Sequence, residues 1–187
     1  MTQYRPRPWQ PLISNAILTH ARVNVFAGMG SGKTSGTLEA LATLFMFGSI
    51  RRVLVIAPKR VATNTWPEAL QGFQESFGWM TVAVAVGTPD QRHAAIKSTT
   101  HIVTINFDNL PWLIEHYGAA WPFDMVVVDE STKLRGLRVS MQTHKKSGKR
   151  FLTGQGASRA KDLARVAHTK VKRWVNLTGT PALAGLK

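Results

Sequence analysis

The octapeptide from Ala27 to Thr34, Ala-Gly-Met-Gly-Ser-Gly-Lys-Thr, constrains the fold more than any other part of the chain. It matches the phosphate-loop pattern, in which a small residue and four spacers precede Gly-Lys-Thr. Its glycines allow a tight curl in which successive backbone N–H groups point at one anion. The apolar run 23–27 predicts a strand before the loop, and the periodic run 37–47 predicts a helix ending at Gly48. Such a unit predicts an α/β fold with a phosphate site at the helix N-terminus.

The loop residues have distinct predicted parts in holding a nucleotide. Backbone N–H groups surround the phosphates, Lys33 carries a positive charge to the β- and γ-phosphates, and the hydroxyl of Thr34 is placed to ligate Mg²⁺. The nucleotide-binding residues predicted in the loop are Gly28, Met29, Gly30, Ser31, Gly32, Lys33 and Thr34. A chance glycine-rich turn is the alternative, and the predicted strand and helix on either side argue against it.

Apolar runs recur along the chain at the spacing of alternating strands and helices. Further strands are predicted at 52–57, 81–86, 101–105, 125–128 and 171–177, and helices at 13–20, 65–77, 89–97 and 157–172 and through Trp112 and Tyr117. This alternation predicts a mainly parallel sheet with helices on both faces. We also expect an extended proline-rich arm at 4–11, a helix N-cap at Thr65, and a long basic loop without periodic structure at 136–150.

Two adjacent carboxylates follow one of the predicted strands. Asp129 and Glu130 come directly after the apolar run 125–128. Asp129 is predicted to hold Mg²⁺ opposite Thr34, and Glu130 to orient and deprotonate the attacking water. The predicted catalytic residues are therefore Lys33, Asp129 and Glu130. For Glu130, a helix-capping or surface carboxylate is the alternative.

Other polar stretches stand at the predicted carboxyl ends of strands, where sheets of this kind bind ligands. The segment 58–60, Pro-Lys-Arg, follows the second strand, and Asn106 follows the fourth. The hydroxyls of Thr178 and Thr180 follow the last strand, on the γ-phosphate side, although a strand-end turn would also explain this sequence. Several independent motifs thus converge on one edge of the predicted sheet.

Gln10 precedes the loop by seventeen residues, counted to Ala27. A glutamine amide can donate and accept hydrogen bonds at once, which matches the N6 and N7 edge of adenine. Beside a phosphate loop, adenine recognition and an ordinary surface glutamine are equally good explanations.

The charge of the chain points to a polyanionic partner. It has 24 Lys and Arg against 10 Asp and Glu, a formal net charge of +14. Fourteen of the basic residues, and one acidic residue, Asp162, lie between 131 and 187. Such a basic cluster favours nucleic acid as the partner. The alternatives are a solvated basic surface and a surface that a missing acidic domain would cover.

Other features bound the class of protein. A length of 187 residues suits one domain with a full core, and the absence of cysteine excludes disulfides and thiolate metal sites. The first ten residues lack the apolar core of a signal peptide, and the longest apolar run, 41–48, is too short to span a bilayer. We therefore expect a soluble cytoplasmic protein without a membrane partner.

Over nearly the whole chain, these stretches resemble the first RecA-like lobe of superfamily-two helicases and translocases. The similarity is greatest to the Snf-type, chromatin-remodeller-like ATPases, in the compact versions carried by bacteriophages. Gln10 corresponds to the family's adenine-reading glutamine, Lys33 and Thr34 correspond to its motif I, and the segment 177–181 matches its motif III. The residues that the resemblance implies to couple hydrolysis to movement are Thr178, Gly179 and Thr180.

The remaining motifs imply contacts with Mg²⁺ and nucleic acid. The segment 129–132 matches motif II, although Asp-Glu-Ser-Thr stands where this branch commonly has Asp-Glu-Ala-His or Asp-Glu-Gly-His. The segment 57–59 matches motif Ia, which touches the nucleic-acid backbone, and the segment 104–106 sits where motif Ib lies. The nucleic-acid contacts implied are Pro58, Lys59, Arg60, Thr104 and Asn106.

The resemblance implies an ATP-binding lobe that uses ATP and Mg²⁺ to move on nucleic acid. It favours DNA over RNA as the nucleic acid, and it implies a location in the cytoplasm of a bacterial or phage-infected cell. It divides the chain into an arm at 1–20, with the adenine-reading glutamine, and the lobe at 21–187. The family completes its ATP site with a second RecA-like lobe that supplies arginine fingers, and Lys187 comes just after motif III. We therefore expect a second lobe in cis or in trans, and weak ATP binding and hydrolysis by this chain alone.

Two other functions remain open at this point. A non-catalytic nucleic-acid-binding or regulatory module would keep the fold and the charge, but would have no need of Lys33, Asp129 and Glu130. A viral packaging ATPase would share the phosphate loop, but neither the glutamine arm nor motif III. For most of the aromatic residues Trp9, Trp112, Trp121 and Phe123, a core position is favoured over an interface with another lobe.

Overall fold

The apolar runs predicted as strands form one sheet in the computed structural model, which describes residues 2–132, 140–143, 150–153, 163 and 170–179. This six-stranded sheet has the order β1-β8-β5-β2-β4-β3, and each neighbouring pair is parallel. Its strands are β1 (Arg22–Phe26), β2 (Val53–Ala57), β3 (Val82–Val84), β4 (Ile102–Asn106), β5 (Met125–Asp129) and β8 (Arg173–Thr178). The predicted α/β fold is confirmed.

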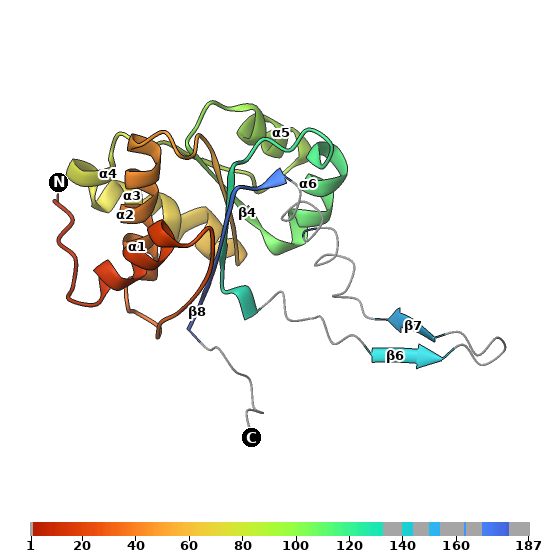
Figure 1. The fold of residues 1–187 in the computed structure, drawn as a ribbon. Helices are drawn as coiled ribbons and strands as arrows, with labels where there is room; N and C mark the ends of the chain where they lie inside the picture. Colours follow the sequence, from red (N-terminus) through yellow and green to blue (C-terminus); the bar gives the residue numbers. More distant parts are fainter. Residues whose placement is uncertain (1, 133–139, 144–149, 154–162, 164–169, 180–187) are drawn as a thin grey trace, which may run out of the picture.

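Helices cover both faces of the sheet, as predicted. The helical segments described are α1 (Gln10–Thr19), α2 (Lys33–Met46), a π-helical turn η1 (Val61–Thr65), α3 (Trp66–Gly72), α4 (Gln74–Phe77), α5 (Pro89–Lys97), a 3₁₀ turn η2 (Phe107–Asn109) and α6 (Leu110–Tyr117). The helices α1 to α4 lie on one side of the sheet, and α5 and α6 lie on the other (Figure 1).

Two apolar layers fill the space between the sheet and these helices. Alternate side chains of β2 separate into them, so Val55 packs in one layer with Trp66. Ile56 packs in the other layer with Leu113. Because both faces of the sheet are covered, β2, β4 and β5 are buried along their whole length, which explains their nearly continuous apolar sequences.

Asp124 ties together the amino ends of three strands. Its carboxylate accepts hydrogen bonds from the backbone N–H groups of Arg51 (2.8 Å) and Arg52 (3.2 Å), just before β2, and pairs with Lys172 (3.1 Å), just before β8. Burial alone would raise the pKa of Asp124, but these hydrogen bonds and the Lys172 charge outweigh it and hold the pKa below its usual range. Folding therefore favours the charged carboxylate.

We expect the free energy of unfolding to fall at acid pH because of Asp124. Its contribution is complete above the unfolded pKa of about 3.9, and it is lost as the pH falls through the lower folded pKa. Asp124→Asn should remove about 1–2 kcal/mol at neutral pH and flatten the acid limb, measured by urea unfolding followed by circular dichroism. Glu115→Gln, an exposed carboxyl on α6, is the control. An equally steep acid limb in both variants would contradict this assignment.

Two predictions about helix starts are wrong. Gln10 is not part of an extended arm but the first residue of α1, because Pro11 sits in the first turn, where a helix tolerates proline. Thr65 is not an N-cap, since its backbone is already helical and its side chain makes no capping hydrogen bond. The helical path there begins at Lys59 and passes through the π-helical turn.

The predicted basic loop at 136–150 contains regular structure. Residues 140–143 form β6 (Ser140–Thr143), which pairs antiparallel with β7 (Arg150–Thr153). Polar and basic residues in this stretch hide the strand signal, because the pair makes a sheet of its own and so needs no long apolar run. Most of the predicted helix 157–172 lies outside the described residues.

Candidate functional site

The residues predicted to bind ligands gather at the carboxyl edge of the sheet. Since β8 lies between β1 and β5, the ends of these three strands are adjacent, with Phe26 beside Thr178. Gly179 follows β8 and packs against the loop after β1, because a Cβ built on it would lie 3.5 Å from Cγ of Met29. In Figure 1 this edge is at the lower end of β8. The strand order thus brings the loop, the end of β8 and the carboxylates 129–130 together.

The loop between β1 and α2 has a backbone that requires glycine at two positions. Gly30 and Gly32 have φ angles of 71° and 76°, in the left-handed region. At Gly32 a side chain is excluded for a second reason, since a Cβ would collide with the amide of Gln10. The helix α2 begins at Lys33, earlier than the predicted start at Thr37, so its unpaired first-turn N–H groups belong to the loop itself. This arrangement favours an anion at the loop.

The side chains of the loop also suit a phosphate chain. The Nζ of Lys33 donates to the carbonyl oxygens of Ala27 and Gly28, at 2.8 Å each. Ser31 Oγ is buried and has no hydrogen-bond partner in the described part of the chain. At Gly28 and Gly30, a Cβ would meet no heavy atom within 4 Å, so this side of the loop is open. A cation, an orphaned hydroxyl and an open side fit the phosphates of a nucleotide.

Asp129 ends β5 as a buried carboxylate with a bond to each oxygen. Oδ1 accepts a hydrogen bond from the backbone N–H of Glu130 (3.0 Å), and Oδ2 accepts one from Nε1 of Trp66 (3.2 Å). Burial raises the pKa of Asp129 above its usual range, and the Trp66 hydrogen bond and the charge of Lys33 act against that rise. The end of β5 lies beside β8, whose last residue bonds to the start of the loop, so Asp129 and the loop stand at the same edge of the sheet.

The donor groups at this edge fit Mg²⁺. A carboxylate at Asp129 and a hydroxyl at Thr34 are the hard oxygen ligands that Mg²⁺ takes, and Mg²⁺ commonly uses one or two such groups together with substrate phosphates. Within the described ranges, no group of three or more His, Cys, Asp or Glu side chains could hold a metal without such help. Thr34 and Asp129 are thus the residues at this edge that would supply oxygen ligands to Mg²⁺.

Glu130 has a strained backbone. Its φ angle is 56°, and it is the one non-glycine residue with positive φ in the described part of the chain. A left-handed conformation costs an L-residue roughly 1–2 kcal/mol. Strain of this kind is typical of functional sites, where a side chain must point in a direction that the regular strand does not give.

Gln10 connects the N-terminal arm with the loop. Its Oε1 accepts from the backbone N–H of Arg7 (2.7 Å) and the hydroxyl of Tyr4 (3.3 Å). Its Nε2 donates to the carbonyl oxygen of Gly32 (3.2 Å) and to Oγ of Ser35 (2.9 Å). The side chain is 4% exposed, so the alternative of an ordinary surface glutamine is wrong. Its part in reading adenine stays a prediction.

The sequence did not reveal that Trp9 and Arg7 also reach the loop. Nε1 of Trp9 donates to the carbonyl oxygen of Ser31 (2.9 Å), and Nη1 of Arg7 donates to that of Gly30 (3.4 Å). Trp9 is 46% exposed and lies outside the core, where most of its aromatic set was expected. Phe123 is buried as predicted, whereas the other two tryptophans of that set are half-buried. Trp9 misleads because a hydrogen bond, rather than burial, holds its ring.

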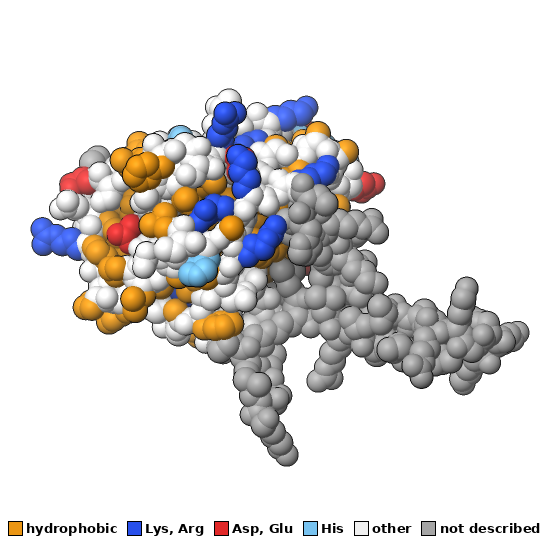
Figure 2. All heavy atoms as spheres, viewed as in Figure 1, with side chains coloured by type: hydrophobic (Ala, Val, Ile, Leu, Met, Phe, Trp, Pro, Cys, Tyr) orange, Lys and Arg blue, Asp and Glu red, His pale blue; other side chains and the backbone are white. Residues whose placement is uncertain are grey.

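The predicted nucleic-acid contacts differ in how accessible they are. Lys59 and Arg60 are exposed at the end of β2, and Pro58 is half-buried. Thr104 is fully buried and donates from Oγ1 to the carbonyl oxygen of Ala62 (2.7 Å), so it is not available to nucleic acid, contrary to the prediction. Lys and Arg side chains are more frequent than Asp and Glu on the face shown in Figure 2, in agreement with the net charge of +14.

The polar ends of β4 and β8 are largely covered. Asn106 is 6% exposed, and its Oδ1 is buried without a hydrogen-bond partner among the described residues. Thr178 is also buried, and its backbone carbonyl accepts from the N–H of Ala27 at the start of the loop (3.1 Å). Thr178 therefore touches the loop through its backbone. Thr180 lies outside the described residues.

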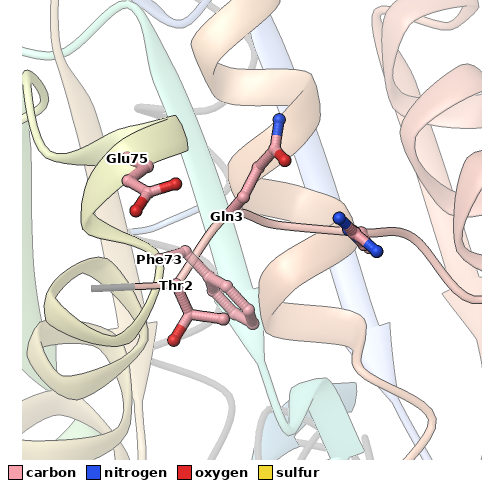
Figure 3. A pocket seen from close by; sticks show the side chains of 5 residues that line it. Thr2, Gln3, Phe73 and Glu75 are labelled. Atoms are coloured by element: carbon pink, nitrogen blue, oxygen red, sulfur yellow. The ribbon is translucent and has the colours of Figure 1, made fainter.

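A separate hollow of about 600 Å³ lies where the arm crosses the helical segment after β2. It is lined by Thr2, Gln3, Arg5, Phe73 and Glu75. In Figure 3 the labelled Gln3 and Glu75 side chains lie apart rather than pointing at one another. None of its lining comes from the loop or from the strand ends, so it is not part of the candidate site.

No protein-family model matches the chain. Protein p41 of Acyrthosiphon pisum secondary endosymbiont phage 1 is 42% identical to it over 193 aligned residues, which cover the whole chain and 38% of the phage protein. A solved structure, the Sulfolobus solfataricus SWI2/SNF2 ATPase core in complex with dsDNA, matches it with a TM-score of 0.70 at 19% identity. That match covers 96% of this chain and 33% of the Sulfolobus chain.

These comparisons show the fold. The sheet and its helices match a RecA-like lobe of the SWI2/SNF2 ATPase core, as the resemblance in the sequence implied. The chain spans well under half the length of each of these two proteins. No helix in the described ranges is long and apolar enough to cross a membrane.

Proposed function

We propose that this lobe binds ATP with Mg²⁺ and hydrolyses it in response to nucleic acid, as the first lobe of a helicase or translocase. One observation carries the proposal, namely the convergence of the loop, Gly179 and the carboxylates 129–130 on one edge of the sheet. The charge of Lys33 acts on the pKa of Asp129 across this edge. A loop that binds phosphates and a carboxylate that holds a cation serve one nucleotide only if they face each other in this way.

In this proposal the loop N–H groups and Lys33 bind the phosphates, and Gln10 and Trp9 hold the arm over the loop beside the adenine. Thr34 and Asp129 hold Mg²⁺, which when bound neutralises charge on the phosphate oxygens. Glu130 orients a water molecule and takes its proton. The water oxygen then forms a bond to the γ-phosphorus while the bond to the ADP oxygen breaks, which leaves ADP and phosphate.

The nucleic acid is DNA in this proposal, because the structural neighbour is a complex with dsDNA. Lys59 and Arg60 would contact phosphates beside the ATP site, since they stand exposed at the end of β2, next to β5. A second RecA-like lobe, in cis or in trans, would supply the remaining groups around the γ-phosphate. That lobe is proposed from the family resemblance and from the greater length of the SWI2/SNF2 chain.

The Lys59→Glu, Arg60→Glu double variant tests the DNA side of the proposal. We expect its affinity for duplex DNA to fall. The slope of log K against the logarithm of the salt concentration should become shallower by about 2, because two phosphate contacts are lost. Arg51→Glu with Lys97→Glu is the matched control, because both residues are exposed and lie away from the carboxyl edge. Fluorescence anisotropy at several salt concentrations measures both quantities.

The second measurement in this test is the rate of ATP hydrolysis with and without duplex DNA. ATP hydrolysis by the wild-type chain should rise when duplex DNA is added, and the rise should be lost in the Lys59→Glu, Arg60→Glu variant. Equal loss of DNA affinity in the control variant would show a diffuse charge effect rather than a contact at this edge. DNA binding without nucleotide binding would favour the non-catalytic module.

A further inference from the structure

Trp66 is the long-range partner of Asp129 among the described contacts. Oδ1 of Asp129 accepts from its own chain neighbour, whereas Oδ2 accepts from an indole 63 residues away (3.2 Å). Trp66 is fully buried, so the direction of its N–H bond is fixed by packing. The orientation of the carboxylate therefore depends on a helix that follows a different strand.

The position of Trp66 depends in turn on the π-helical turn before it. A π-helical turn holds more residues than an α-helical one, so it rotates the next helical residues about the helix axis, and such turns are frequent at functional sites. The turn is held by bonds from Thr104 Oγ1 to the carbonyl oxygen of Ala62 (2.7 Å) and from Thr63 Oγ1 to that of Lys59 (2.9 Å). This local irregularity brings the indole N–H to Asp129.

Core packing alone does not explain why a tryptophan, rather than another large apolar residue, stands at position 66. A phenylalanine would fill much of the same apolar space without placing a polar N–H against a buried carboxylate. We propose that Trp66 is a positioning residue, whose N–H orients the Asp129 carboxylate so that its free lone pairs face a magnesium ion bound with nucleotide. This inference rests on the proposed function and adds to it a residue outside the motifs that predicted the site.

The Mg²⁺ dependence of ADP binding tests the proposal. Partners that orient metal ligands typically change metal affinity by about 10–100-fold when they are removed. In Trp66→Phe we therefore expect Mg²⁺ to bind the ADP complex about 10–100-fold more weakly, while ADP in excess EDTA binds as in the wild type. A loss of packing alone would lower both affinities together. Fluorescent ADP titrated with Mg²⁺ gives both values.

A matched control exists in the same protein. Trp121 is half-buried, and its Nε1 is buried without a hydrogen-bond partner among the described residues, so Trp121→Phe removes an indole N–H that orients nothing. We expect this variant to keep the wild-type Mg²⁺ dependence. If Trp66→Phe does not fold, 3-benzothienylalanine at position 66, in which sulfur replaces the N–H, keeps the volume and tests the hydrogen bond directly.

Combining Trp66→Phe with Asp129→Ala tests whether Trp66 acts on Mg²⁺ binding through the Asp129 carboxylate. In Asp129→Ala the ligand is absent, so adding Trp66→Phe should weaken Mg²⁺ binding no further. The same Mg²⁺ dependence in Trp66→Phe and Trp121→Phe, with a wild type that binds Mg·ADP, would overturn this inference and leave the proposed function standing. A wild type that binds no ADP would overturn the proposed function and this inference with it.

Discussion

Lys33→Ala is expected to lower the affinity for ATP about a hundredfold or more. The Nζ of Lys33 donates to two carbonyl oxygens of the loop, and in the proposed complex it donates to phosphate oxygens as well. Hydrogen bonds between charged groups are worth about 1.5–3 kcal/mol each, and about 1.4 kcal/mol is a tenfold change in affinity. The free energy of unfolding should change much less than the affinity, because the two hydrogen bonds of Lys33 are only partly buried or exposed, so water can replace its ammonium group at both carbonyl oxygens.

Lys170→Ala is the matched control for this experiment. The Nζ of Lys170 also donates to two carbonyl oxygens, those of Gly118 and Ala119, but at the amino edge of the sheet. Its loss should leave the affinity for ATP unchanged. Calorimetric titration with a non-hydrolysable ATP analogue measures both variants, and circular dichroism checks their folding. If Lys33→Ala binds the analogue as tightly as the wild type does, the loop is not a phosphate site.

Glu130→Gln is expected to lower ATP turnover about 10²–10⁴-fold, the usual contribution of a general base. ATP affinity should change little, because glutamine keeps the size and most contacts of the side chain. Turnover is measured as phosphate release with protein in excess over ATP and with duplex DNA present, so that one slow cycle is enough. A variant that releases phosphate at the wild-type rate would show that Glu130 is not the base.

Glu130→Gly should lower turnover but raise stability, so it tests the strained backbone at this position. It should also lose turnover, but its free energy of unfolding should rise by about 1 kcal/mol, because glycine adopts a φ of 56° without strain. Glu130→Gln keeps that strain and should have wild-type stability. A glycine variant less stable than the wild type would mean that contacts of the Glu130 side chain outweigh the strain of its backbone.

The sheet was largely predictable from the sequence because its middle strands are covered on both faces. Val53–Ala57 and Met125–Asp129 are apolar almost throughout, and their ends fall within a residue or two of the predictions. The loop was predictable because Gly30 and Gly32 must be glycine for their φ angles. In both cases the physical requirement, burial on both faces or a positive φ angle, determines which residues can stand at those positions, so it is visible in the local sequence.

The parts that were not predictable depend on packing between distant segments. Nothing near Trp66 in the sequence shows that it donates to Asp129, because the contact needs both the strand order and the π-helical turn. Thr104 stands in a motif position, yet its hydroxyl is used inside the fold. Trp9 has a large aromatic side chain of the kind that usually lies in a core, but its Nε1 donates a hydrogen bond to the loop. Each error comes from a tertiary contact that overrides a local pattern.

The strand order also decides when the nucleotide site can form during synthesis. The strand that carries the loop, β1, has one neighbour in the sheet, β8. Side chains of these two strands that bond to each other, Asn24 and Asn176, are 152 residues apart. On the ribosome, β1 therefore emerges first and joins the sheet last, while β2 to β5 can already pair. A nascent chain halted before β8 emerges would hold a partial sheet with an open edge and no formed site, a species prone to aggregation and a natural client for chaperones.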